Sequence, residues 1–355
     1  MYKYDYTNII DITNFRVAYG LICIVFLLFT GFKLNHGAIH SHSQKMAGIT
    51  VVAPPAPFHL NPFEEILTIN ARWIAIIPYA FTRPGEGEVR YNHRRQWWGE
   101  TPEGIRESIL KAKENGFRIM LKPQVYIPGS WVGDMNFTSE DDWHLWESTY
   151  EKYIMDMVCI AMELDVELFC IGTEYKWAAT KREAFWRRLV TNIRDVYDGT
   201  LTYSANWDQY NQIPFWDALD FIGISAYFPL TEEVNPTPDL LKKKWKPIVR
   251  TLKKFSEKNR KKILFTEYGY LSVDGCAGSS WLLEKNIRNL SVNEEAQATA
   301  YKALLSTFHA EDFWAGGFLW KWFPSMKGHE GYPERDYTPQ GKMAEEVIRE
   351  MYGAF

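Results

Sequence analysis

Eight short apolar segments recur along the chain, and each is rich in β-branched and aromatic residues. Most are apolar at nearly every position, which is typical of parallel strands whose two faces are both covered by other elements. Most successive segments are far enough apart for a helix to lie between them, as in strand–helix–strand units. The segments are residues 48–54, 73–81, 117–125, 166–174, 201–206, 221–228, 262–270 and 314–322.

Helix signals fill most of the connections. Thr101 and Pro102 are a typical N-cap and first helical residue, and a stop signal follows at Asn115. The connections 55–72 and 207–220 have room only for short helices. Further helical patterns cover residues 139–163, 180–197, 240–258, 293–309 and 339–351.

This alternation of eight strands with helices predicts an α/β fold of the (β/α)8 TIM-barrel type. A doubly wound open sheet is the alternative fold. Such sheets usually carry a glycine-rich phosphate-binding turn after the first strand, and this chain has APPAPF at residues 53–58 instead. We therefore expect the barrel.

An uncharged apolar run at residues 17–32 sets the N-terminus apart from the barrel region. It is shorter than the about 20 residues of a typical membrane span and close in length to the apolar core of a signal peptide. No small-residue cleavage site follows it. We expect an N-terminal segment at 1–16, a hydrophobic signal-anchor at 17–32, a linker at 33–45 and a barrel domain at 46–355.

This organisation predicts an exported protein. The barrel domain is expected outside the cytoplasm, held to the membrane through the N-terminal anchor. Secretion after cleavage of a signal peptide and a buried core helix are the alternatives for the apolar run.

The charge balance limits the partners of the chain. Its 40 Lys and Arg residues against 44 Asp and Glu give a net charge of −4 at pH 7, whereas nucleic-acid-binding proteins usually show a basic excess or stripe. Four cysteines are too few for a disulfide framework, and neither they nor the histidines show metal-ligand spacing. We expect no nucleic acid, no metal and no cofactor, and the sequence indicates no oligomeric state.

Two carboxylates follow apolar strands of the expected barrel. Glu174 ends the segment VELFCIGTE, and Glu267 lies in the segment KILFTEYGY. Active sites of such barrels lie at the carboxyl ends of the strands, so both side chains are expected at one mouth. A glycosidase needs one carboxylic acid to protonate the leaving oxygen and one carboxylate to attack or to activate water. The alternative is two structural carboxylates, each held by a neighbouring arginine or lysine.

Other strand ends carry side chains suited to a sugar. Trp320 offers a flat apolar ring for the C–H face of a pyranose, and Asn206 and Trp207 combine a polar and an aromatic group. The Tyr227 hydroxyl can hydrogen-bond a carboxylate, and the third expected strand, 117–125, carries Lys122. We expect these five residues to bind substrate.

Further tryptophans have two interpretations, sugar contact or packing between barrel and helices. Trp97 and Trp98 are adjacent in the loop after the second strand, so that if one packs inward the other can face the mouth, and Trp98 is included among the substrate-binding residues. Trp143, Trp146 and Trp186 lie on expected helices and are assigned to packing.

Several motifs together resemble glycoside hydrolase family 113, the β-mannanases of clan A. The resemblance covers residues 47–351 and is specific when its motifs are taken together. They are VVAPP, QWWGET, LKPQV, FCIGTE, SANWD, AYFPL, LFTEYGY and GGFLWKW.

The resemblance implies a barrel enzyme that hydrolyses β-1,4-linked mannose, or a related hexose, by a retaining double displacement. It implies Glu174 as acid/base, Glu267 as nucleophile, Tyr227 as the residue supporting the nucleophile and Trp320 as the sugar platform. Many clan A enzymes have an asparagine directly before the acid/base, where this chain has Thr173. Asn206 or Lys122 is then expected to contact the sugar 2-hydroxyl, unless the substrate differs there.

We therefore expect a retaining glycoside hydrolase acting on a β-linked hexose polysaccharide, and specifically an endo-β-1,4-mannanase. An exo-acting β-glycosidase is one alternative. A non-catalytic carbohydrate-binding barrel at the cell surface is the other.

Overall fold

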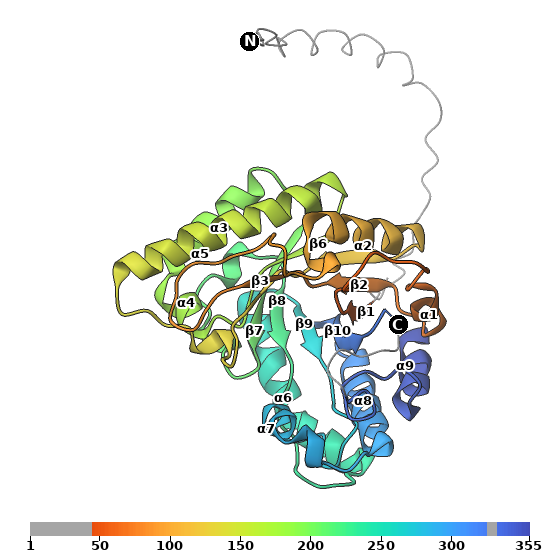
Figure 1. Ribbon diagram of the computed structural model, residues 1–355. Helices are drawn as coiled ribbons and strands as arrows, with labels where there is room; N and C mark the ends of the chain where they lie inside the picture. Colours follow the sequence, from red (N-terminus) through yellow and green to blue (C-terminus); the bar gives the residue numbers. More distant parts are fainter. Residues whose placement is uncertain (1–44, 325–331) are drawn as a thin grey trace, which may run out of the picture. The chain divides into compact units, whose positions relative to one another are not determined.

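The computed structural model describes residues 45–324 and 332–355 of the chain. In this part of the chain, eight parallel strands close into a barrel in the order β1-β10-β9-β8-β7-β6-β4-β2, with helices around its outside (Figure 1). The predicted (β/α)8 barrel is confirmed. Its strands are β1 (Met46–Val51), β2 (Trp73–Ile76), β4 (Arg118–Leu121), β6 (Leu168–Thr173), β7 (Thr200–Asn206), β8 (Ile222–Ser225), β9 (Ile263–Tyr268) and β10 (Trp314–Trp322).

Two of the expected strands are split by proline. One residue separates Pro78 from the end of β2, and one residue separates Pro123 from the end of β4. Proline has no N–H to donate to a strand neighbour, so it interrupts the hydrogen-bond ladder. Beyond the prolines, β3 (Tyr79–Phe81) and β5 (Gln124–Tyr126) pair in a separate two-stranded parallel sheet.

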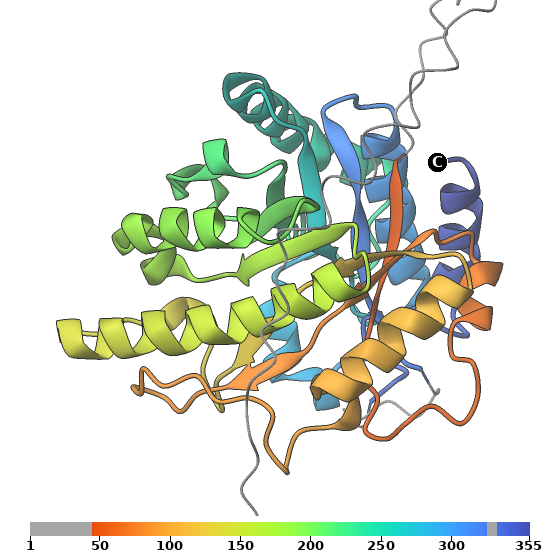
Figure 2. The ribbon, with the colours of Figure 1, turned by 90° about the horizontal axis from the view of Figure 1, so that it is seen from above.

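The helices begin where the sequence signals place them. The Thr101 hydroxyl accepts a hydrogen bond from Gly104 N at 3.2 Å, which confirms it as an N-cap. The pattern expected at 180–197 is divided between α4 and α5. Figure 2 shows the long helix α3, in yellow-green, running along the outside of the strands. The helices are α1 (Glu64–Thr68), α2 (Pro102–Glu114), α3 (Glu140–Glu163), α4 (Lys176–Lys181), α5 (Glu183–Arg194), α6 (Pro238–Asn259), α7 (Ser280–Lys285), α8 (Glu294–His309) and α9 (Met343–Gly353).

Short 3-10 turns lie in the loops between these elements. Two of them, η2 and η3, belong to the connections that follow the second and third barrel strands. The turns are η2 (Trp98–Glu100), η3 (Val132–Asp134), η4 (Tyr210–Gln212), η5 (Trp216–Ala218) and η6 (Ile287–Asn289).

The tryptophans expected to pack between helices and barrel do so. Trp143, Trp146 and Trp186 are almost completely buried, and their rings contact one another and nearby tyrosines. These tryptophans therefore stabilise the layer between the strands and α3 and α5 through burial of apolar surface.

Side chains change from apolar to polar along the barrel interior. A small apolar cluster separate from the main core includes Met120 of β4 and Leu264 of β9. Side chains two residues apart share a face of a strand, so Lys122 and Thr266 belong to the next layer towards the carboxyl ends. Both are completely buried, and the Thr266 hydroxyl lies 2.6 Å from that of Ser204. The polar layer leads directly to the mouth of the barrel.

The expected N-terminal elements fall largely outside the described residues. The segment 1–16, the anchor at 17–32 and all of the linker except Lys45 lie there. Within residues 45–324 and 332–355, none of the helices is long and apolar enough to cross a membrane. Strand β1 begins at Met46.

Candidate active site

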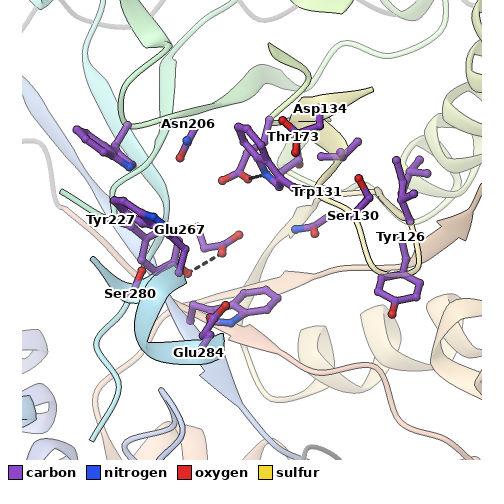
Figure 3. A pocket seen from close by; sticks show the side chains of 18 of the residues that line it. Tyr126, Ser130, Trp131, Asp134, Thr173, Asn206, Tyr227, Glu267, Ser280 and Glu284 are labelled. Atoms are coloured by element: carbon purple, nitrogen blue, oxygen red, sulfur yellow. Dashed lines mark hydrogen bonds between the residues drawn. The ribbon is translucent and has the colours of Figure 1, made fainter. Parts of the chain in front are cut away.

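A cavity of about 820 Å³ lies where five neighbouring barrel strands end, those from β6 to β10. Further walls come from the β3 and β5 strands, from the loop around η3 and from α7. Figure 3 shows Tyr227 beside Glu267 and Trp131 beside Thr173 around this cavity. The carboxyl ends of the strands thus meet at one site, as the barrel topology requires.

Most of the residues expected to form a site come together here. Lys122 is completely buried and contacts Glu267. Trp98 is not among the residues that line the cavity. Those that do line it are Glu174, Glu267, Asn206, Trp207, Tyr227 and Trp320.

Glu267 is held on both carboxylate oxygens. The Tyr227 hydroxyl donates to Oε1 at 2.6 Å, and the Lys122 ammonium donates to Oε2. Strand β9 shows register shifts against both neighbours beyond Phe265, and Glu267 lies in this irregular stretch. A buried carboxylate with an ammonium partner is stabilised in its charged form, because the partner offsets the lost hydration. Lys122 thus supplies the cation next to the carboxylate.

Glu174 has neutral hydrogen-bond partners and a raised pKa. The indole Nε1 of Trp131 donates to Oε2 at 2.7 Å. Burial, and after it the negative charge of Glu267, raise the pKa of the Glu174 carboxyl above its ordinary range. The Trp131 indole, the Ser225 hydroxyl and the Lys122 ammonium act on the pKa in the opposite direction, with a smaller effect.

The backbone of Glu174 is also unusual. Its φ of 58° lies in the left-handed region, which is unfavourable for residues other than glycine by about 1–3 kcal/mol. Its N–H donates to the Ser204 carbonyl at 2.8 Å, which holds this conformation against the neighbouring strand β7. The turn at the end of β6 thereby directs the carboxyl into the cavity.

Two carboxyl groups with opposite environments can perform acid and nucleophile chemistry together. A carboxyl whose pKa is raised by burial and a like charge holds its proton to higher pH and can donate it, while an ion-paired carboxylate can attack an electrophilic carbon. Both carboxyl groups line the same cavity, and the negative charge of Glu267 raises the pKa of Glu174.

Aromatic rings form two walls of the site. Trp320 is partly buried, and its ring centroid lies 6.0 Å from Lys122 Nζ and 5.6 Å from Lys321 Nζ. Trp207 stacks on Trp281 of α7, with ring centroids 5.8 Å apart and planes at 19°. Flat, partly exposed rings at a polar cavity are suited to the apolar faces of sugars.

Two polar residues end neighbouring strands at the cavity. Asn206 is the last residue of β7, and Thr173 is the last residue of β6. The Asn206 amide donates to Asp208 at 3.0 Å and lines the cavity. Thr173 also lines it but is almost completely buried. Of the two residues expected to contact a 2-hydroxyl, Asn206 is the more accessible, since Lys122 is engaged with Glu267.

Trp98 lies elsewhere, and the expectation that it faces the mouth does not hold. Its indole donates to Glu107 of α2 at 2.5 Å, and its carbonyl accepts from Thr101 at the start of that helix. A Cβ at Gly104 would lie 1.9 Å from the Trp98 carbonyl oxygen, so the turn and the helix are in close contact. Packing against α2 fixes Trp98 away from the cavity.

Among the cavity residues that were not expected from the sequence are two tryptophans, Trp131 and Trp281. Both lie in long connections that follow barrel strands, one between β5 and α3 and the other on the short helix α7. The available signal was their position alone, because every connection after a barrel strand begins at the mouth. Within the described residues, there is no group of three or more His, Cys, Asp or Glu side chains that could hold a metal ion.

The family model of Glycoside Hydrolase Family 113 matches residues 60–342. The chain belongs to this family. It is therefore a glycoside hydrolase, and the resemblance seen in its motifs is confirmed. No curated protein matches the chain.

Solved structures of family members share its fold. A family 113 β-mannanase from Alicyclobacillus acidocaldarius, in complex with ManMIm, is 25% identical, with a TM-score of 0.75 over 87% of this chain and 97% of that one. A family 113 β-1,4-mannanase is 24% identical, with a TM-score of 0.71 over 88% of this chain and 100% of the other.

A more distant neighbour shares only the barrel. A β-glucuronidase from Faecalibacterium prausnitzii is 14% identical, with a TM-score of 0.60, and the match covers 88% of this chain but 49% of that one. This likeness describes the fold and gives no indication of the substrate.

Proposed function

We propose that this family 113 glycoside hydrolase is an endo-β-1,4-mannanase that works with retention of configuration. The substrate class is supported by the likeness to the A. acidocaldarius β-mannanase over nearly all of that protein's length. The mechanism is supported by one observation, that a carboxyl with a raised pKa and an ion-paired carboxylate line the same cavity.

In the first step, Glu267 attacks the anomeric carbon while Glu174 protonates the leaving oxygen. Tyr227 and Lys122 hold the attacking carboxylate in place through one hydrogen bond to each oxygen until the glycosyl ester forms. Trp320 stacks on the sugar next to the cleavage point, and Asn206 and Trp207 bind neighbouring hydroxyls and ring faces.

In the second step, Glu174 removes a proton from the water that hydrolyses the ester. Formation of the ester removes the negative charge of Glu267, which is the second-largest cause of the raised pKa of Glu174. The pKa of Glu174 then falls, and the carboxyl that was an acid becomes a base. This reciprocal change is the requirement of a double displacement.

Hydrolysis of a panel of glycans tests the substrate class. The full chain is incubated with β-mannan, β-glucan, xylan and galactan, with Glu267→Gln as the inactive control. We expect release of reducing ends from mannan, and initial products whose NMR spectrum shows the β-anomer. Release from another glycan alone would refute the mannanase proposal, and initial α-anomer would refute retention.

Product size distinguishes an endo-acting enzyme from an exo-acting one. The loop around η3 and helix α7 both contribute to the cavity wall, and their arrangement decides how many sugars extend beyond the cleavage point. We expect a rapid fall in mannan viscosity with mixed oligosaccharides as early products. Early accumulation of a single short product would instead indicate exo action.

We further propose that the enzyme is exported and held to the membrane by residues 17–32, with the barrel outside the cytoplasm. The uncharged apolar run in the sequence supports this proposal. Cell fractionation of the full chain, compared with a chain lacking residues 1–44, tests it. We expect the full chain in the membrane fraction; its recovery from the soluble exported fraction would indicate a cleaved signal.

A further inference from the structure

One cavity residue, Trp131, has no role in the chemistry described so far. It lies in the connection between β5 and α3, just before the turn η3. Its indole is partly buried and donates to Glu174 Oε2 at 2.7 Å, across a separation of 43 residues in the chain. A tryptophan bonded to the carboxyl with the raised pKa is in a position to orient that carboxyl.

Gly133 provides the surface on which the Trp131 ring lies. A Cβ at this position would lie 2.3 Å from Cη2 and Cζ3 of the indole and 2.5 Å from Cζ2. Real Cβ atoms do not approach other heavy atoms so closely. Any side chain at position 133 would therefore push the ring away from its present place, and with it the N–H that reaches Glu174.

The loop is in turn supported by the helix that follows Glu174. Turn η3 packs against α4, and the Lys181 ammonium of α4 donates to the Asn136 side chain at 2.9 Å. The acid/base residue and the loop that contacts it are thus attached to the same short helix. This arrangement resists independent movement of Trp131 and Glu174.

We propose that Trp131, seated on Gly133, is a positioning residue that fixes which oxygen of the Glu174 carboxyl carries the transferable proton. The inference rests on the proposed function of Glu174 as acid/base. An indole nitrogen is only a donor, so Oε2 must accept from it through a lone pair. In a neutral carboxylic acid the carbonyl oxygen is the stronger acceptor, so the indole bond to Oε2 favours the proton on Oε1.

The same bond assists the second half of the reaction. A hydrogen bond to an ionised carboxylate is about twice as strong as one to a neutral group. Trp131 therefore stabilises Glu174 most when it is the base, and limits the rise in its pKa caused by burial and Glu267. Without the indole N–H, the Glu174 carboxyl is expected to have a higher pKa and no fixed orientation.

The test replaces Trp131 with phenylalanine, which keeps an aromatic ring and removes the donor. Trp131→Phe and Gly133→Ala are compared with the wild-type full chain. Trp73→Phe is the matched control, because Trp73 is the first residue of β2, at the other end of the strand from the carboxyl ends, and is not among the residues lining the cavity. Two substrates are used. The sugar leaving group of mannotriose must be protonated, whereas the dinitrophenolate of dinitrophenyl β-mannobioside departs without a proton.

We expect Trp131→Phe to lower kcat/KM for mannotriose about 10-fold and to leave kcat/KM for the dinitrophenyl substrate nearly unchanged. The alkaline limb of the pH profile moves to higher pH, because the acid holds its proton longer. NMR titration of labelled Glu carboxyl carbons, with Glu174 assigned through Glu174→Gln, shows the same upward shift. Gly133→Ala reproduces these effects, and Trp73→Phe shows none of them.

Other results overturn the inference. Equal losses on both substrates with an unchanged pH profile would mean that Trp131 only maintains the shape of the loop. An unchanged Glu174 titration in Trp131→Phe would show that the indole bond does not act on the carboxyl. If the wild type hydrolyses neither substrate, the proposed function fails, whereas the NMR titration still decides whether Trp131 acts on Glu174.

Discussion

The two halves of the cavity each contain a glutamate, and the two glutamates have opposite electrostatic surroundings. On the β9 side, Glu267 has a buried ammonium on one oxygen and a tyrosine hydroxyl on the other. On the β6 side, Glu174 has an indole N–H on one oxygen and a carboxylate across the cavity, and its pKa is raised. Residue type therefore does not assign the two roles; the charge of the nearest partner does.

The two glutamates also differ in what holds them, which is the barrel interior for Glu267 and a loop for Glu174. Lys122 reaches Glu267 from within the barrel, where both side chains are buried in a closed sheet. Trp131 reaches Glu174 from a loop outside the barrel. The proposed nucleophile is thus held by the barrel strands, whereas the proposed acid/base is contacted by a loop, the part of a fold that varies most among relatives.

The largest effect is expected from removal of the nucleophile. Glu267→Ala should lower kcat about 10³-fold or more, because no covalent intermediate can form. Steady-state hydrolysis of mannan measures the loss, and Glu103→Ala on the exposed face of α2 is the control. Activity within about tenfold of the wild type would show that Glu267 is not the nucleophile, and the proposed difference in role between the two glutamates would be wrong.

Removal of the acid should give a smaller and substrate-dependent effect. Glu174→Gln is expected to lower kcat/KM for mannotriose about 10²-fold to 10³-fold and to affect the dinitrophenyl substrate much less. The wild-type kcat/KM should fall as pH rises through the raised pKa of Glu174, since the acid must be protonated. This alkaline limb should vanish in Glu174→Gln; its persistence would assign the acid to another group.

Loss of the buried ammonium should affect both stability and activity. Lys122→Met leaves a buried carboxylate without its cation, a change that destabilises proteins by about 3–5 kcal/mol. We expect a lower Tm and about a 10²-fold lower kcat. The double variant Lys122→Met with Glu267→Gln has no charge to compensate and should regain most of the Tm but none of the activity. A double variant as unstable as the single one would argue against an ion pair.

Loss of the tyrosine hydroxyl should be milder. Tyr227→Phe removes one charge-assisted hydrogen bond, worth about 1.5–3 kcal/mol, and keeps the ring that packs against Tyr337. We expect kcat to fall roughly 10-fold to 100-fold with little change in KM. A change confined to KM would instead assign Tyr227 to substrate binding.

The smallest effect is expected outside the cavity. Trp98→Phe removes the hydrogen bond to Glu107 and should lower the free energy of unfolding by about 1 kcal/mol. Its kcat/KM on mannan should stay within about twofold of the wild type. A large loss of activity with an unchanged Tm would show that Trp98 contacts substrate and that the binding site extends beyond the residues that line the cavity.

Much of the site followed from strand ends alone. In a closed parallel barrel every strand points the same way, so a polar residue at the end of any apolar run is delivered to one mouth. Glu174, Asn206, Tyr227, Glu267 and Trp320 were found by this argument. The same argument gives the wrong position for Trp98, because its loop turns back to α2. The path of a loop leaves no periodic pattern in the sequence.

The amino-acid sequence by itself determined the barrel and the positions of its two carboxylates, because strand periodicity and strand direction are local properties. Only the tertiary structure decided their environments. Lys122 meets Glu267 across 145 residues and Trp131 meets Glu174 across 43. Such pairings depend on where strands and loops come together in space, and it is these distant partners that set the charge and the orientation of each carboxyl.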